Sequence, residues 1–241
     1  MDALTLPVIP SHRDINASPD ELTLLKKCRP YTMTPPEVTL NAIRAAQYVA
    51  EKNILGTVVE CGVWRGGVSM AMASTLKMCG QTRDLYLYDT FDGMSEPTEN
   101  DIAPSGQKAE VLLKKLAKDE QNHIWAFAPI DKVRSNVESV GYPAEKIKFV
   151  QGKVEDTIPG TITENIALLR LDTYWYESTK HELLHLYPLL VSGGVLILDD
   201  YGYWAGARKA VDEFFETLNA KPELHIVYDG IANSARWAIK P

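Results

Sequence analysis

Two kinds of apolar pattern alternate along the chain. Short, nearly continuous apolar runs rich in β-branched residues predict buried strands, whereas apolar residues spaced three or four apart predict amphipathic helices. The predicted strands cover residues 56–62, 85–89, 146–152, 166–172 and 193–200. The predicted helices cover residues 35–53, 68–78, 111–117, 132–139, 177–190 and 207–218. A hairpin of residues 224–229 and 234–240, turned at Gly230 and Asn233, is expected at the end of the chain.

Strands that alternate with helices, each strand almost wholly apolar, indicate a parallel sheet with helices on both faces. The predicted fold class is therefore α/β, with a doubly wound, Rossmann-like, mostly parallel sheet. The closing hairpin adds an antiparallel C-terminal edge strand. No internal repeat or low-complexity linker divides the sequence, so we expect a single core.

Two segments stand apart from this alternation. Residues 1–30 contain four prolines and one short apolar patch, Leu22 to Leu25, so we interpret them as an N-terminal arm or cap. Residues 91–133 form a long insertion after the second strand, and their mixture of prolines, glycine and aromatic residues fits a lid over a site. A surface insertion without order is the alternative.

Composition narrows the possible classes of protein. The 241 residues, 45% hydrophobic and 24% charged, fit one globular domain. A formal net charge of −7 without any basic run argues against nucleic-acid binding. Three irregularly spaced cysteines do not make a disulfide framework or a zinc site, and no segment approaches the roughly 18 apolar residues of a membrane span. We expect a cytoplasmic protein with a small-molecule substrate and no nucleic-acid or membrane partner.

Acidic residues end the predicted strands. Ligands of an open α/β sheet bind beyond the carboxyl ends of its strands, so the residues there are the first candidates for a site. They are Glu60, Asp89, Asp172, Asp199 and Asp200.

The loop after the first predicted strand, ECGVWRGG (60–67), leads into a helix whose first N–H groups are free to bind a ligand. It is not a dinucleotide fingerprint, because Trp64 stands where G-x-G-x-x-G requires a glycine and Glu60 would repel a pyrophosphate. Glu60 instead suits a cationic amino-acid head. A tight turn without a ligand is the alternative.

Asp89 ends the next strand of the chain. A carboxylate in this place can accept hydrogen bonds from both hydroxyls of a ribose, although a turn or helix-capping role would explain it equally well. Together, Glu60 and Asp89 favour a nucleoside ligand that lacks a dinucleotide phosphate bridge.

Three further carboxylates, those of Asp172, Asp199 and Asp200, end two strands that we expect to be neighbours. Like charges at such short range are costly unless a cation neutralises them. An oxygen-only ligand set suits Mg²⁺ or another hard divalent ion. The alternative is that one or two of these aspartates cap the helices that follow.

Several ordered segments resemble one known family. They are YTMT (31–34), VVECGVWRGG (58–67), LYDTFDGM (87–94), VEDTIP (154–159), LLRLDTYWYEST (168–179), and GGVLILDDYG with GARKAVDEFF within 193–215. From about Tyr31 to the C-terminus the chain resembles the macrocin O-methyltransferase (TylF/MycF) family of S-adenosylmethionine- and Mg²⁺-dependent enzymes. The resemblance implies a class I methyltransferase domain over 31–241, methyl transfer to a sugar hydroxyl of a glycosylated natural product or saccharide, and a homo-oligomer.

The same resemblance implies roles for individual residues. Asp172, Asp199 and Asp200 match the metal ligands, and Asp172 also matches the general base. Residues matching the cofactor site are Glu60, Gly62 and Ser69 near the methionine part, Asp89 at the ribose, Val154 and Glu155 near the adenine, and Tyr31, Thr32 and Met33 in a segment that closes over the cofactor.

One position departs from the family pattern. Many relatives read D-x-D-x-Y-E-S-T, and this chain has Tyr174 at the second acidic position. If that position helps to hold metal or substrate, this protein binds a different acceptor or binds the metal more weakly. A catechol-type phenolic O-methyltransferase and a catalytically silent S-adenosylmethionine-binding protein are the alternatives. A nicotinamide oxidoreductase would need the glycine fingerprint that Trp64 interrupts.

Overall fold

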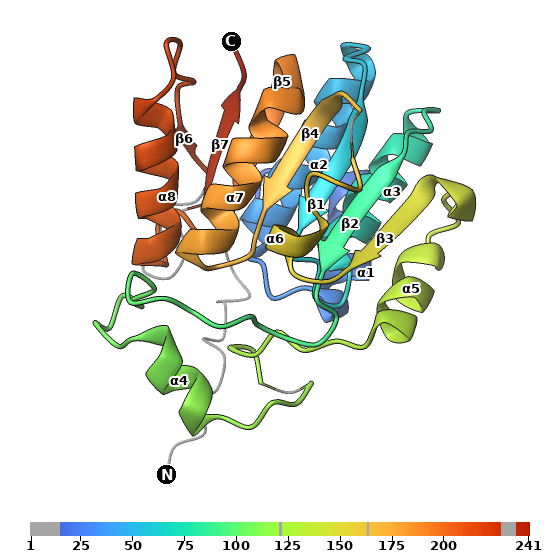
Figure 1. The fold of residues 1–241 in the computed structure, drawn as a ribbon. Helices are drawn as coiled ribbons and strands as arrows, with labels where there is room; N and C mark the ends of the chain where they lie inside the picture. Colours follow the sequence, from blue (N-terminus) through green and yellow to red (C-terminus); the bar gives the residue numbers. More distant parts are fainter. Residues whose placement is uncertain (1–14, 121, 163, 228–234) are drawn as a thin grey trace.

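The computed structural model describes residues 15–120, 122–162, 164–227 and 235–241. These residues form three layers, a sheet between two groups of helices (Figure 1). The described strands are β1 (Thr57–Cys61), β2 (Leu85–Asp89), β3 (Ile147–Gln151), β4 (Ile166–Leu171), β5 (Leu190–Leu198), β6 (His225–Ile226) and β7 (Arg236–Ile239).

The sheet has the order β3-β2-β1-β4-β5-β7-β6. The first five strands in this order pair in parallel, while β7 pairs antiparallel with β5 and β6 pairs antiparallel with β7. The predicted α/β class, the mostly parallel sheet and the antiparallel C-terminal edge are confirmed. The predicted turn at Gly230 and Asn233 lies outside the described residues. Strand order reverses between β1 and β4, and a ligand of such a sheet binds at that crossover.

Helices cover both faces of the sheet. On one face, α1, α2, α3 and α5 pack in one apolar cluster, and on the other α6, α7 and α8 pack in a second. Their bounds are α1 (Pro19–Cys28), α2 (Pro36–Glu51), α3 (Gly67–Met78), α5 (Ile130–Glu138), α6 (Val154–Thr157), α7 (Tyr176–Leu186) and α8 (Ala205–Glu216).

Most boundaries differ from those predicted by one or two residues, and two larger differences have a local cause. Helix α7 ends at Leu186 rather than 190, because Pro188 has no N–H to continue the helix, and a 3₁₀ turn (Tyr187–Leu189) follows. Strand β5 begins at Leu190 rather than 193, because it pairs with β4 both before and after Gly193. The φ of +79° at Gly193 allows the shift of register between these two paired parts.

The N-terminal segment contains a helix that was not predicted from the sequence. Ser18 begins α1 through a reciprocal pair of bonds with Glu21, in which the Ser18 hydroxyl accepts from the Glu21 N–H and the Glu21 carboxylate accepts from the Ser18 N–H. Leu24, Leu25 and Cys28 of this helix are buried in the core cluster that includes α2 and α3. The sequence S-P-D-E carries the capping-box signature, so the signal was present.

The insertion predicted over 91–133 crosses the carboxyl ends of the strands (Figure 1). It carries the short helix α4 (Ala109–Lys115), and its Ala103, Ala109 and Leu113 pack against Trp175 and Trp204, which follow strands β4 and β5. This segment therefore borders the edge where the sequence places its acidic residues.

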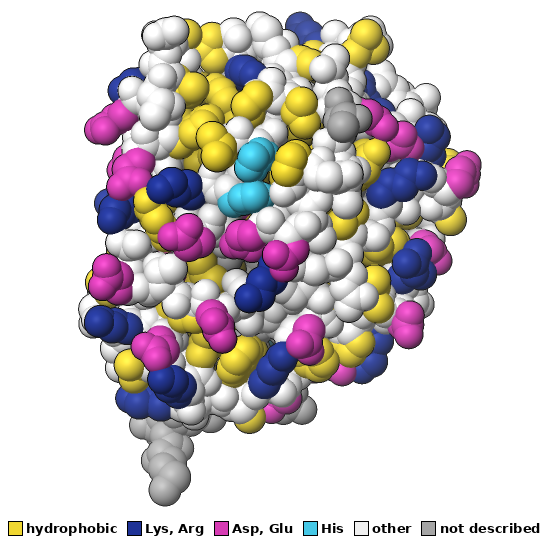
Figure 2. Space-filling view, viewed as in Figure 1, with side chains coloured by type: hydrophobic (Ala, Val, Ile, Leu, Met, Phe, Trp, Pro, Cys, Tyr) yellow, Lys and Arg dark blue, Asp and Glu magenta, His cyan; other side chains and the backbone are white. Residues whose placement is uncertain are grey.

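Among the described residues, no helix has the length and apolar character that crossing a bilayer requires. On the face drawn in Figure 2, Lys and Arg side chains are interspersed with Asp and Glu side chains. That mixture agrees with the absence of a basic run from the sequence.

The three cysteine thiols differ sharply in accessibility. Cys28 and Cys61 are buried and Cys79 is exposed, and burial raises the pKa of Cys28 to about 11 and that of Cys61 well above its usual value. Because the thiolate is the reactive form, we predict that Ellman's reagent labels one thiol quickly in the native protein and three after denaturation. The Cys79→Ser variant should lose the fast reaction; rapid labelling that survives this change would contradict the packing described here.

Candidate active site

The alternation of side chains along neighbouring strands gathers charge on one face of the sheet. Val58 of β1 and Leu168 of β4 point into the core cluster on the α2 and α3 side. Every second side chain of a strand lies on the same face, so Glu60 lies on this face of β1. Arg170 and Asp172 lie on the same face at the end of β4. Glu60 pairs in register with Arg170 across β1 and β4. The parallel register therefore sets a buried glutamate beside a buried arginine.

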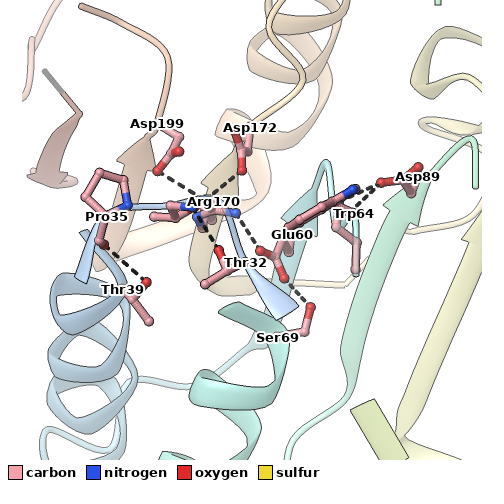
Figure 3. Close-up of polar contacts among 12 residues, drawn as sticks. Thr32, Pro35, Thr39, Glu60, Trp64, Ser69, Asp89, Arg170, Asp172 and Asp199 are labelled. Carbon is pink, nitrogen blue, oxygen red and sulfur yellow. Dashed lines mark hydrogen bonds and ion pairs between the residues drawn. The ribbon is translucent and has the colours of Figure 1, made fainter. Parts of the chain in front are cut away.

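The Arg170 guanidinium is the centre of the cluster (Figure 3). Its Nη1 donates to Glu60 Oε1 at 2.6 Å, and its Nη2 donates to Asp172 Oδ2 at 2.7 Å. Nη2 also lies 3.1 Å from Asp199 Oδ1 and donates to Thr34 Oγ1 at 3.0 Å. Arg170 is 1% exposed, so almost all of its solvation comes from these four partners.

Charge in the cluster is not balanced by this one cation. Burial by itself would lower the pKa of Arg170, but the carboxylates of Asp172, Asp199 and Glu60 raise it well above its usual value, so the guanidinium stays charged. Burial raises the pKa of Asp172 well above its usual range. It raises the pKa of Asp200 to about 8, with repulsion from Asp199 as the second cause. The cluster is therefore prepared to take up a proton or a further cation.

Two carboxylate oxygens of Asp199 and Asp200 have no hydrogen-bond partner among the described residues. Asp199 Oδ1 is near Arg170 but outside hydrogen-bond geometry, and Asp200 Oδ2 has no partner. No group of three or more His, Cys, Asp or Glu side chains in the described part of the chain is already arranged around a metal position. The unsatisfied oxygens and the all-oxygen donor set nevertheless fit a hard divalent ion such as Mg²⁺.

Glu60 and Ser69, both predicted at the cofactor, are brought together by the structure. The Ser69 hydroxyl donates to Glu60 Oε2 while Arg170 occupies Oε1, and Glu60 is 1% exposed. Burial raises the pKa of Glu60, against the opposing effect of Arg170. Both oxygens of Glu60 are thus bound within the protein, and its contact with a cationic amino-acid head stays a prediction.

Asp89 holds the loop between β1 and α3. Its Oδ2 accepts from the N–H groups of Val63 and Trp64 at 2.7 and 2.9 Å, and its Oδ1 accepts from the Phe91 N–H at 2.8 Å. Asp89 was expected at ribose hydroxyls or, equally well, in a turn; the bond from Phe91 fits the turn, whereas the bonds from Val63 and Trp64 were not foreseen. Asp89 therefore shapes the loop, with Trp64 in the left-handed region at φ of +47°.

Gly62 is required by the close approach of two strand ends. Its φ is +83°, and a Cβ added there would lie 2.0 Å from the Asp172 carbonyl oxygen. The Asp172 N–H donates to the Cys61 carbonyl at 2.8 Å, which extends the ladder past the last residue of β4. Any side chain at 62 would displace Asp172.

The segment Tyr31–Thr34 packs over the start of α3. A Cβ on Gly67 would lie 2.7 Å from backbone or side-chain atoms of Tyr31 and Thr32, and Thr34 accepts a hydrogen bond from Arg170. Met33 Sδ lies 3.2 Å from Nδ1 of His123 in the insertion. The segment thus lies between the acidic cluster and the insertion.

The other two predicted cofactor residues lie beyond β3. Val154 is buried in the apolar cluster on the α7 side of the sheet, while Glu155 is partly exposed, and both begin the short helix α6. His181, which was discounted as a metal ligand, contacts the Ile158 carbonyl through Nε2 at 2.9 Å, and its ring lies tilted against that of His185. Neither histidine joins the acidic cluster.

Asp101 fastens the insertion to the edge of the sheet and was not singled out in the sequence. Its carboxylate accepts from the N–H and hydroxyl of Thr98 at 2.6 and 2.9 Å, and from the N–H of Tyr176 at the start of α7 at 2.7 Å. Nearby, Trp175 Nε1 donates to the Ser95 carbonyl at 3.0 Å. Residues 95–103 are therefore bonded to the segment that directly follows Asp172.

Arg170 was also missed, although its signal was present as a single basic residue in the apolar run IALLRLD. A lone charge inside a buried strand requires a partner of opposite charge. Glu60, Asp172 and Asp199, at the ends of β1, β4 and β5, are these partners.

The parallel order β3-β2-β1-β4-β5, continued by the antiparallel β7, together with the likeness to a solved O-methyltransferase, identifies the class I S-adenosylmethionine-dependent methyltransferase fold. The model of the Macrocin-O-methyltransferase (TylF) family matches residues 26–232, and the chain belongs to this family. The resemblance noted in the sequence is thereby confirmed.

Three known proteins illustrate the relationship. The chain is 35% identical over 182 residues to 8-demethyl-8-(2,3-dimethoxy-alpha-L-rhamnosyl)-tetracenomycin-C 4'-O-methyltransferase of Streptomyces olivaceus, covering 73% of this chain and 66% of the relative. It is 31% identical to demethyldecarbamoylnovobiocin O-methyltransferase of Streptomyces niveus, covering 76% and 67%. The solved O-methyltransferase NovP superposes with a TM-score of 0.71 at 28% identity, covering 87% of this chain and 82% of that one. The chain thus spans about two thirds of the length of the curated relatives it matches.

Arg170 should be required for stability. Replacing it by Met leaves buried carboxylates without their cation, and breaking a buried ion pair in this way costs about 3–5 kcal/mol. We expect the free energy of unfolding, measured by urea denaturation, to fall by that amount, with Arg170→Lys intermediate. Lys132→Met, which removes an exposed partner of Glu120, should change it by less than about 0.5 kcal/mol. Equal effects of Arg170→Met and Lys132→Met would show that Arg170 does not hold the cluster.

Asp101 should control the attachment of the insertion. The Asp101→Ala change leaves the buried Tyr176 N–H without an acceptor, which costs about 1–3 kcal/mol. We expect trypsin to cleave the insertion of this variant at Lys108, Lys114 or Lys115 faster than in the wild type, as followed by mass spectrometry. Glu99→Ala removes an exposed carboxylate two residues away and should leave the cleavage rate unchanged. Similar rates in all three proteins would argue against this attachment.

Proposed function

We propose that this protein is an S-adenosylmethionine- and Mg²⁺-dependent O-methyltransferase that acts on a sugar hydroxyl of a glycosylated natural product or saccharide. The observation that carries the proposal is the acidic cluster at the carboxyl ends of β1, β4 and β5, next to the crossover where such folds bind their ligands. Family membership and the activities for which the two relatives are named support it.

For the donor, the loop from β1 to α3 and the segment Tyr31–Thr34 form the proposed binding site. Glu60, Gly62 and Ser69 would lie at the methionine part, Asp89 at the ribose, and Val154 with Glu155 towards the adenine. When bound, S-adenosylmethionine supplies a methyl group on a sulfonium. The backbone bonds of Asp89 keep the loop in one conformation, which reduces the entropy lost on binding.

Asp172 is the proposed general base. Its side chain is 17% exposed, against 10% for Asp199 and 1% for Glu60, so it is the most accessible of the carboxylates bound to Arg170. Arg170 fixes its orientation and burial raises its pKa, which makes it a stronger base than an exposed aspartate. Mg²⁺, held by Asp172, Asp199 and Asp200, would lower the pKa of acceptor hydroxyls.

In the proposed reaction the acceptor hydroxyl loses its proton to the Asp172 carboxylate. Bound S-adenosylmethionine would supply the methyl group to that oxygen, and the electron pair of its broken C–S bond would stay on the sulfur of the departing S-adenosylhomocysteine. Holding oxygen, carbon and sulfur in line provides much of the rate, because well-oriented groups reach effective molarities of about 10⁵ M or more. The insertion over 91–133 is proposed as the lid that keeps water out.

The decisive experiment combines binding and turnover. We expect calorimetry to detect S-adenosylmethionine binding by the wild type and Mg²⁺ binding that Asp199→Ala loses. Labelled methyl should pass to 4-nitrophenyl α-L-rhamnopyranoside in preference to catechol, and EDTA should stop this transfer. The rhamnoside is chosen because one relative acts on a rhamnosyl group.

The matched variant for catalysis is Asp172→Asn, which keeps the shape and can still accept from Arg170. Since a positioned base contributes about 10²- to 10⁴-fold, we expect kcat to fall at least 100-fold while the Kd for S-adenosylmethionine changes less than threefold. Asp131→Asn on the exposed face of α5 is the control and should be unaffected. Binding without transfer to any acceptor would favour a silent binding protein, and no cofactor binding would refute the methyltransferase proposal.

A further inference from the structure

Tyr174 adopts a backbone conformation that a bulky residue rarely takes. Its φ is +70°, in the left-handed region, where side chains other than glycine, asparagine and aspartate are disfavoured because Cβ comes too close to the following carbonyl oxygen. It lies in the turn between β4 and α7, two residues after Asp172, and the Trp175 N–H closes this turn by donating to the Thr173 carbonyl at 2.9 Å. A strained bulky residue beside a site calls for an explanation by function.

The ring of Tyr174 is a partly buried member of an aromatic cluster. It stacks on Trp204 with ring centres 6.0 Å apart and planes at 26°, and meets Trp175 edge-on at 5.8 Å. Trp175 and Trp204 are 1% and 2% exposed, whereas Tyr174 is only partly buried. The two tryptophans are therefore fully buried beneath the insertion, whereas part of the Tyr174 ring remains accessible to a ligand.

The Tyr174 hydroxyl has no hydrogen-bond partner among the described residues, and the residue stands two positions after Asp172. A tyrosine hydroxyl can donate a hydrogen bond as well as accept one. Trp175 Nε1, by contrast, is satisfied by Ser95. A partly accessible donor close to the acidic end of β4 is available to a ligand.

We propose that Tyr174 is the residue that selects the acceptor, with its ring packing on the apolar face of the sugar and its hydroxyl binding a sugar oxygen next to the hydroxyl that reacts. This inference rests on the proposed function and adds a residue that none of the roles assigned above includes. It places an aromatic wall and a hydroxyl donor close to the acidic end of β4. Acceptors that offer both a C–H face and a neighbouring oxygen are therefore favoured over flat phenols, which lack the first.

The test compares Tyr174→Phe with the wild type. This variant keeps the ring and the strained backbone and removes only the hydroxyl, so its melting temperature should be unchanged. We expect KM for 4-nitrophenyl α-L-rhamnopyranoside to rise about 3- to 10-fold, the worth of one hydrogen bond, with kcat within twofold and an unchanged Kd for S-adenosylmethionine. Tyr174→Leu, which also removes the ring, should raise KM further. Tyr48→Phe, on helix α2, is the control for removing a tyrosine hydroxyl elsewhere.

Binding of the rhamnoside in the presence of S-adenosylhomocysteine is measured in parallel, so that the role of Tyr174 can be judged without turnover. An unchanged KM and an unchanged Kd for the rhamnoside in Tyr174→Phe would overturn the proposal, even if the wild type is an active methyltransferase. A fall in kcat alone would also overturn it, because acceptor selection acts on binding. A wild type that binds the rhamnoside but transfers no methyl group to it would refute the proposed function. The comparison of Kd values for the rhamnoside would then still test whether Tyr174 binds the sugar. A wild type that neither binds nor methylates it would overturn both.

Discussion

The buried guanidinium of Arg170 is the interaction on which the site depends. It joins β1 through Glu60, β4 through Asp172, β5 through Asp199 and the N-terminal segment through Thr34, all by the two Nη atoms. A lysine ammonium could not match this arrangement, because the planar fork of arginine reaches several acceptors at once. The same contact therefore sets both the spacing of the strand ends and the orientation of the carboxylates.

The backbone of the surrounding loops also holds Asp172 in place. Gly62 allows the loop after β1 to pass against the Asp172 carbonyl, and Asp89 fixes that loop through two N–H groups. Asp101 then bonds the insertion to the Tyr176 N–H, where the turn after Asp172 leads into α7. Since these contacts meet at Asp172 and the segment that follows it, changes at these positions will not be additive in their effects on stability.

Much of this arrangement was predictable from the sequence, because the pattern of apolar runs indicates which residues end the parallel strands. Asp172, Asp199 and Asp200 were placed at one edge by that reasoning alone, and the sheet confirms their common edge. The bonds from Asp89 to backbone N–H groups could not be foreseen, since they depend on how the loop folds back over 25 and 26 residues of chain. Arg170 and the capping box at Ser18 were visible and were overlooked.

Burial of the acidic cluster determines both its packing and its acid–base properties. The insertion, with Trp175 and Trp204, packs over the strand ends, and burial is the first cause of the raised pKa of both Asp172 and Asp200. Carboxylates in such surroundings destabilise the fold, because their charge is only partly compensated by Arg170. The same surroundings make Asp172 a better proton acceptor and strengthen every electrostatic contact with a bound ligand. A site that is costly to fold is, for that reason, one that is well suited to take up a proton and a cation.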